Sequence, residues 1–128
     1  MGQLIAIACG GALGALGRFG LQHWISSLYN GRFPLAIFLA NSIGSLCLGL
    51  AYVLIVERGI ERDLISEFWR PFLMVGLLGA FTTFSTFSLD TLRLIEEGFW
   101  LLAASNILAN ILCALLGAFI GMNLGRWL

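Results

Sequence analysis

The chain has 128 residues, of which 59% are hydrophobic and 11% charged, and its formal net charge is zero. A mean hydropathy of +0.95 excludes an ordinary water-soluble domain. Because one span needs about 20 apolar residues, we expect a single four-helix transmembrane domain over residues 1–128, all-α, surrounded by membrane lipid and without a nucleic-acid partner.

Charged and aromatic residues divide the chain into four predicted spans, at roughly residues 3–26, 33–56, 70–95 and 99–125. Four tryptophans near the proposed ends support this division, because indole rings favour the membrane interface. They are Trp24, Trp69, Trp100 and Trp127. We interpret the first segment as a retained span and not a signal peptide. The connection 57–67 carries both charge signs, which is typical of a solvated loop or of a short surface helix.

The first span is rich in glycine and lacks acidic residues. Gly10 and Gly14 form a small-xxx-small pair, which favours close helix packing. Residues 1–30 contain no Asp or Glu, which argues against a proton-coupled exporter of the small multidrug-resistance class. His23 is interpreted as an interfacial side chain.

The second and fourth spans carry neutral amides that can donate to an anion. Asn41 lies near the middle of the second span, and Asn106 and Asn110 stand one turn apart on the fourth. The alternative is that these amides only make interhelical hydrogen bonds, each worth about 0.6 kcal/mol.

The third span contains hydroxyls interleaved with phenylalanines over residues 79–88. Because Gly79 and the pair Thr82-Thr83 suit a continuous helix poorly, we expect a break that frees carbonyls for a monovalent cation. Phe84 and Phe87 share a helix face, with Phe81 expected on the same row. Ring edges turned toward a pore would favour a small anion, whereas the ordinary alternative is lipid-facing phenylalanine. The hydroxyls displaced from that row are Ser85, Thr86 and Ser88.

The arginines give almost no orientation signal. Four of them fall on one predicted side, Arg58, Arg62, Arg70 and Arg126, and three on the other, Arg18, Arg32 and Arg93. Since an excess of basic residues in cytoplasmic loops normally sets orientation, the chain could insert both ways and pair as an antiparallel dimer. The alternative is one orientation set by details that the count misses.

No enzyme motif is present: the sequence has no HExxH, GxSxG or phosphate loop, and no pair of intramembrane carboxylates. The chain is therefore predicted not to be an enzyme. A passive or anion-handling pathway is the favoured class.

Three stretches resemble the Fluc (CrcB-type) fluoride channels of bacteria. They are residues 10–19 (GGALGALGRF), 41–45 (NSIGS) and 79–87 (GAFTTFSTF). The resemblance implies an antiparallel, dual-topology homodimer in the bacterial inner (plasma) membrane, with two fluoride pores and a structural sodium ion at its centre. It implies passive export of cytoplasmic fluoride as protection against fluoride toxicity.

The resemblance also implies roles for single residues. The fluoride pore would be formed by Asn41, Phe84, Phe87, Ser85, Thr86, Ser88 and Asn110. Backbone carbonyls of Gly79 and Thr82 would bind the sodium ion, and Arg18 would serve a vestibule or structural role. Two other classes stay open, namely a channel for another small anion or solute and a non-transporting membrane scaffold.

Overall fold

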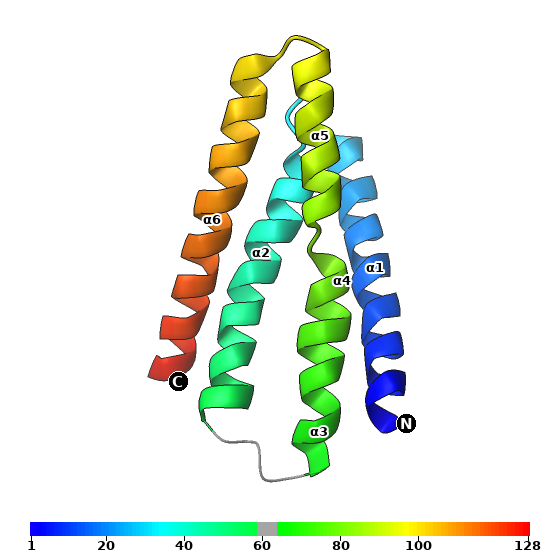
Figure 1. Cartoon of the computed structure of the whole chain (residues 1–128), viewed down its shortest axis with the longest axis vertical. Coiled ribbons are helices and arrows are strands. Elements are labelled where there is room, and N and C mark those ends of the chain that lie inside the picture. Colours follow the sequence, from blue (N-terminus) through cyan, green and yellow to red (C-terminus); the bar gives the residue numbers. More distant parts are fainter. Residues whose placement is uncertain (59–63) are drawn as a thin grey trace.

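The computed structural model describes residues 1–58 and 64–128, and every regular element in these ranges is helical. The helices run side by side along the longest axis of the molecule, and both termini lie at the same end (Figure 1). In chain order the elements are α1 (Gly2–Leu28), α2 (Leu35–Tyr52), a π-helical segment (Val53–Glu57), α3 (Leu64–Arg70), a second π-helical segment (Pro71–Leu78), α4 (Gly79–Phe81), α5 (Phe84–Glu96) and α6 (Trp100–Trp127).

Four stretches of helix are long and apolar enough to cross a membrane, which confirms the four predicted spans. They are Gly2–Leu28, Leu35–Glu57, Glu67–Glu96 and Trp100–Trp127. The charged connection is shorter than predicted, because α3 already begins at Leu64 and leads directly into the third span. Residues 59–63 of that connection, with Arg62, lie outside the described residues.

Within the third span the helix becomes irregular at Pro71. Proline has no N–H to donate to the carbonyl four residues earlier, so its insertion disturbs the α-helical ladder. The following turns, Pro71–Leu78, are π-helical, a widening that occurs at such interruptions.

Small residues let the helices pack backbone to backbone. α2 packs along α6, and α1 packs along the segment Pro71–Leu78. On α6 the buried glycines Gly117 and Gly121 face the backbone of α2, where a methyl group at Gly117 would lie 2.9 Å from the Ser42 carbonyl oxygen. On α1 the buried Gly14 meets the backbone of Leu77 in the same way. The predicted use of glycine for close packing is therefore confirmed for these pairs.

Polar contacts fasten the end of the bundle that holds the C-terminus. The guanidinium of Arg126 donates to both carboxylate oxygens of Glu57, at 2.9 and 2.7 Å, and Arg58 donates to the Arg126 carbonyl oxygen at 2.6 Å. These contacts join the last turn of α6 to the end of the second span.

At the opposite end, the turn between α5 and α6 is closed by backbone hydrogen bonds. Gly98 has φ +82, and the N–H groups of Gly98 and Phe99 donate to Ile95 and Leu94 at 3.0 and 2.7 Å, the Schellman arrangement. Arg32 lies 4.1 Å above the Phe99 ring and 3.9 Å from a Glu97 oxygen. The loop before α2 is thereby held against this turn.

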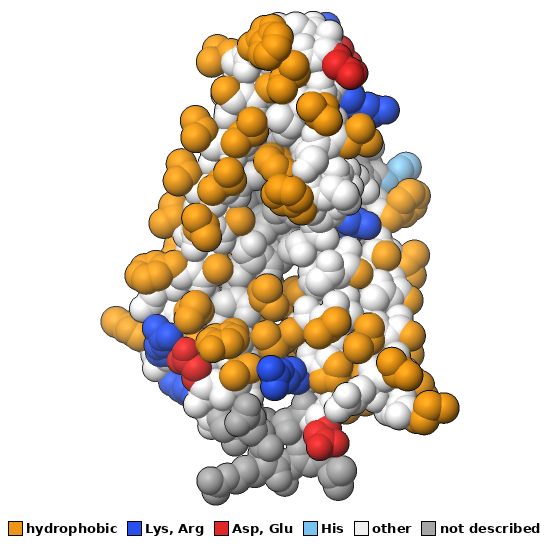
Figure 2. All heavy atoms as spheres, viewed as in Figure 1, with side chains coloured by type: hydrophobic (Ala, Val, Ile, Leu, Met, Phe, Trp, Pro, Cys, Tyr) orange, Lys and Arg blue, Asp and Glu red, His pale blue; other side chains and the backbone are white. Residues whose placement is uncertain are grey.

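Hydrophobic side chains cover the outer faces of the helices, and most charged side chains lie toward the two ends (Figure 2). An outer surface of this kind suits hydrocarbon and not water. The protein is a multi-pass membrane protein.

Gly121→Ala should destabilise the bundle, because the added methyl group would collide with the Leu46 carbonyl oxygen and lie 2.9 Å from the Leu50 nitrogen. Overpacking of this kind costs about 1–3 kcal/mol. Denaturant unfolding in detergent micelles measures the loss. Gly20→Ala is the control, because a methyl group there would meet no atom of a neighbouring element within 4 Å in the described part of the chain. Equal stability of the two variants would contradict the close α2–α6 contact.

Candidate functional site

Between α4 and α5 the backbone leaves the helical conformation for two residues. Thr82 has φ −80 and ψ 155, and Thr83 has φ −154 and ψ 118. Gly44 of α2 permits this path, because a methyl group at that position would collide with the side chain of Thr82. The hydroxyl of Thr83 then caps α5 by accepting a hydrogen bond from the Thr86 N–H at 3.2 Å.

Asn41 pairs with the backbone of this interruption through both ends of its amide. The Asn41 side-chain oxygen accepts from the Thr83 N–H at 2.8 Å, and its Nδ2 donates to the Thr83 carbonyl oxygen at 3.2 Å. Both main-chain polar groups of Thr83 are thus satisfied by one side chain. This matters because an unpaired backbone group within hydrocarbon would cost several kcal/mol.

The second amide proton of Asn41 starts a chain of hydrogen bonds that we call the asparagine relay, formed by Asn41, Asn110, Asn106 and Thr91. Asn41 donates to Asn110 Oδ1 at 3.0 Å, and Asn110 donates to Asn106 Oδ1 at 2.8 Å and to the Asn106 carbonyl oxygen at 3.0 Å. Asn106 donates to Thr91 Oγ1 at 2.9 Å, and the Thr91 hydroxyl donates to the Phe87 carbonyl oxygen at 2.8 Å. The relay therefore connects α2, α6 and α5.

Three members of the relay are buried within the chain itself. Asn106 is 0% exposed, Asn110 4% and Thr91 7%. At this depth a polar group needs a partner, and every side-chain nitrogen of the three asparagines donates to one.

A groove of about 370 Å³ opens beside the interruption, between α2, α5 and α6. It brings together Asn41, Asn110, Phe84, Phe87 and Thr82 of the predicted site. Its lining combines the two amides with aromatic and aliphatic side chains, with Leu48, Ile111 and Leu115 among the apolar members. The resemblance seen in the sequence assigned Asn41, Asn110, Phe84 and Phe87 to one pore, and all four line this groove. Their contact with a permeating ion stays a prediction.

The two groove phenylalanines contact each other but differ in burial. Their ring centroids are 5.4 Å apart at an interplanar angle of 53°. Phe84 is 77% exposed, whereas Phe87 is 7% exposed. The expectation that Phe81 continues their row is wrong, because the extended residues Thr82 and Thr83 reset the helix rotation and place the Phe81 ring 3.6 Å from the position of a methyl group on Gly17 of α1.

The predicted hydroxyl track lies on α5 but not on the groove wall. Ser85 Oγ lies 3.3 Å from Thr83 Oγ1, and Thr86 Oγ1 accepts from Thr83 Oγ1 at 3.0 Å. Ser88 donates to the Phe84 carbonyl oxygen at 2.9 Å. Arg18 is half-buried on α1 and likewise lies away from the groove.

Sequence reasoning missed Thr91, which closes the relay onto Phe87. A signal was available, because Thr91 follows Phe87 by four residues and so lies one turn along the same face of α5. Without the position of α6, that face gave no reason to pair Thr91 with Asn106.

The fold and the groove together define a class of protein: a small four-helix membrane protein whose interior holds a hydrogen-bonded set of neutral amides and hydroxyls. Polar residues at such depth mark substrate or ion pathways in membrane proteins.

Residues 5–122 match the family model described as "CrcB-like protein, Camphor Resistance (CrcB)", and the chain belongs to this family. A relative from Magnetococcus marinus, named "Fluoride-specific ion channel FluC", is 40% identical over 124 residues, which cover 97% of this chain and 98% of the relative. Proteins of the same name from Dehalococcoides mccartyi and Coxiella burnetii are 41% and 36% identical, over 100% and 98% of this chain and 95% and 97% of their own lengths. The resemblance seen in the sequence is confirmed, and the relatives' names agree with the prediction that the chain is not an enzyme.

Asn41→Leu should destabilise the protein by about 1–3 kcal/mol, because it leaves the N–H and carbonyl of Thr83 without their partner. The free energy of unfolding in micelles measures this loss. Asn123→Leu is the matched control, since Asn123 donates to the Phe119 carbonyl of its own helix, at 2.8 Å, and to no other group of residues 1–58 and 64–128. A loss of the same size in both variants would mean that pairing with Thr83 adds nothing.

Proposed function

We propose that the protein is a fluoride-selective channel that passively exports fluoride from the cytoplasm and so protects against fluoride toxicity. The observation that carries the proposal is the convergence of Asn41 and Asn110 with Phe84 and Phe87 in one groove. The names of relatives about 40% identical over nearly the whole chain support fluoride as the ion.

The chemistry of the groove suits a small, strongly hydrated anion. Neutral amides can replace water around fluoride without forming a site so deep that the ion cannot leave. The amide protons of Asn41 and Asn110 are bonded within the protein in this structure, so an entering fluoride ion would take them in exchange for those bonds. Ring edges carry positive charge, so Phe84 and Phe87 add attraction without a full cation. We assign the pore to Asn41, Asn110, Phe84 and Phe87, and the polar track beside it to Ser85, Thr86 and Ser88. Flux runs down the electrochemical gradient, and a negative-inside potential drives the anion outward.

We further propose that the working unit is an antiparallel homodimer in the bacterial inner membrane, with two pores and with the interruption of the third span at mid-membrane. Two observations support pairing: the groove is open on the outside of the protomer, and its Phe84 ring is 77% exposed. The near-equal division of arginines between the two ends supports insertion in both orientations.

A structural sodium ion at the dimer centre is part of the same proposal, held by the carbonyls of Gly79 and Thr82. In a continuous helix these carbonyls would accept from the N–H groups of Thr83 and Thr86. Those two N–H groups donate instead to Asn41 and to the Thr83 hydroxyl. Carbonyls released in this way fit a monovalent cation, which would add positive field near the pores. Arg18 is proposed to act in the vestibule or in packing.

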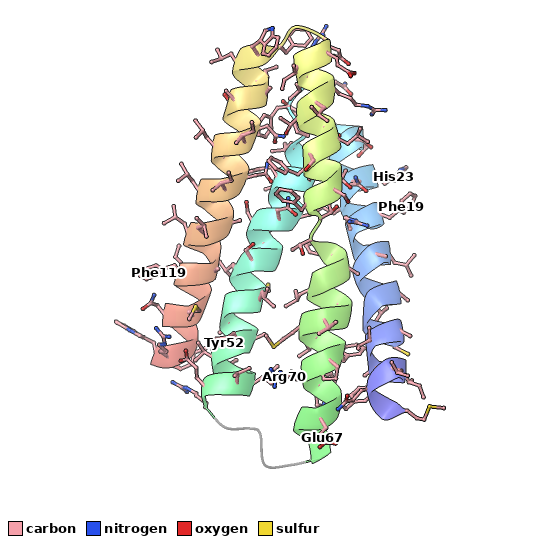
Figure 3. The ribbon with its side chains drawn as sticks, in the orientation of Figure 1. Phe19, His23, Tyr52, Glu67, Arg70 and Phe119 are labelled. Atoms are coloured by element: carbon pink, nitrogen blue, oxygen red, sulfur yellow. The ribbon has the colours of Figure 1, made fainter. Side chains whose placement is uncertain are left out.

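Liposomes that contain the purified protein should release fluoride rapidly and chloride negligibly. Phe84→Ile should lower fluoride release by about tenfold or more, a factor that corresponds to roughly 1.4 kcal/mol. A fluoride electrode measures the release. Phe119→Ile is the matched control, because Phe119 is 65% exposed and points outward from α6 (Figure 3).

The same assay separates the alternatives. Chloride release as fast as fluoride release would favour a channel for other small solutes. No release of either ion from well-folded protein would favour a non-transporting scaffold.

Purified protein should have the mass of two protomers, and replacement of sodium by a large organic cation should lower its melting temperature. An unchanged melting temperature would contradict the sodium site.

A single cysteine appended after Leu128, in a background without Cys9, Cys47 and Cys113, should react with an impermeant maleimide from both sides of the membrane. Labelling from one side only would contradict antiparallel pairing.

A further inference from the structure

The asparagine relay begins and ends on the same short segment of the third span. It begins at the Thr83 N–H, which donates to Asn41, and it ends at the Phe87 carbonyl oxygen, which accepts from Thr91. Between these two points it crosses α2 and α6. The segment that lies between them carries both groove phenylalanines, Phe84 and Phe87.

Donation in the relay runs in one direction, and each member constrains the next. Both amide protons of Asn110 go to Asn106, at 2.8 and 3.0 Å, so Asn110 can present only its oxygen to Asn41. Because the side-chain oxygen of Asn106 accepts from Asn110, its nitrogen is the end left to face Thr91. The bond from Asn41 to the Asn110 oxygen therefore depends on Asn106, which holds the Asn110 amide in this orientation.

Asn106 and Thr91 do not line the groove. Asn106 is 0% exposed and Thr91 is 7% exposed, whereas Asn41 and Asn110 contribute to the groove wall. Direct contact with a permeating ion is thus assigned to Asn41 and Asn110, and the inner pair can act only through them or through Phe87.

We infer that Asn106 and Thr91 are positioning residues for the proposed fluoride pathway. They orient the Asn110 and Asn41 amides and, through the 2.9 Å bond from Asn106 of α6 to Thr91 of α5, fix the rotation of α5 that places Phe84 and Phe87. The inference rests on the proposed function. It differs from simple α5–α6 adhesion, because adhesion would affect stability without affecting the ratio of fluoride to chloride flux.

Thr91→Val is the sharpest test, since it keeps the shape of the side chain and removes only the hydroxyl. It should lower fluoride flux per folded protein about threefold to tenfold and lower the fluoride-to-chloride ratio. Thr91→Ser, which restores the hydroxyl, should recover both. Ser105→Ala is the matched control, because Ser105 makes the same bond to the carbonyl four residues earlier, at 2.8 Å, on α6 and outside the relay.

Asn106→Leu should reproduce the effect of Thr91→Val. The double variant should lose little more than either single variant, since both substitutions interrupt the same chain of hydrogen bonds. Additive losses, an unchanged ratio in Thr91→Val, or an equal loss in Ser105→Ala would each overturn the inference.

Hydrogen exchange of the Thr83 amide gives a readout that needs no transport. Thr91→Val should accelerate this exchange about threefold to tenfold, because the relay holds Asn41 against the Thr83 N–H. If the wild-type protein released no fluoride, the proposed function would be refuted. Hydrogen exchange of the Thr83 amide would still test whether Thr91 helps to hold Asn41 in position. Unchanged exchange in Thr91→Val would overturn that role.

Discussion

The architecture depends on one constraint, which is that backbone groups freed where a helix is interrupted in an apolar interior must be paired within the protein. Here one side chain, Asn41, pairs both polar groups of Thr83. Because this bonding uses the oxygen and one proton of the amide, a second proton remains for Asn110 and so for the rest of the relay. The interruption, the groove and the buried amides are therefore linked by a single residue.

Close helix packing is what brings that residue within reach. Gly44 admits the side chain of Thr82 against α2, and Gly117 and Gly121 bring the backbone of α6 close to α2. Without a hydrophobic force between helices in lipid, such contacts and the interhelical hydrogen bonds supply the cohesion. The same glycines that pack the bundle thus set the distance over which the asparagines bond.

The four spans could be predicted from apolar composition, length and the charged and aromatic residues between them, because these features determine which segments can cross a membrane. The grouping of Asn41, Phe84 and Phe87 came from the resemblance of residues 41–45 and 79–87 to the channel family, and all three line the groove. Phe81 was wrongly placed on the row of Phe84 and Phe87 because the helical repeat was assumed to continue through Thr82 and Thr83, which are extended. Thr91 was missed, and the exclusion of Ser85 from the groove was unforeseen, because both depend on how α5 is rotated against α6, which periodicity within one span does not define.

The bonding of Asn41 to main-chain atoms has a consequence for how the sequence can diverge. Any residue at position 83 except proline offers the same N–H and carbonyl, so the pairing does not depend on which side chain stands there. Position 41, in contrast, must supply an oxygen and an N–H from one planar group of suitable length. Substitutions at position 83 can therefore accumulate by altering the capping of α5, while the tolerance for change is smallest at position 41, on a different helix from the interruption.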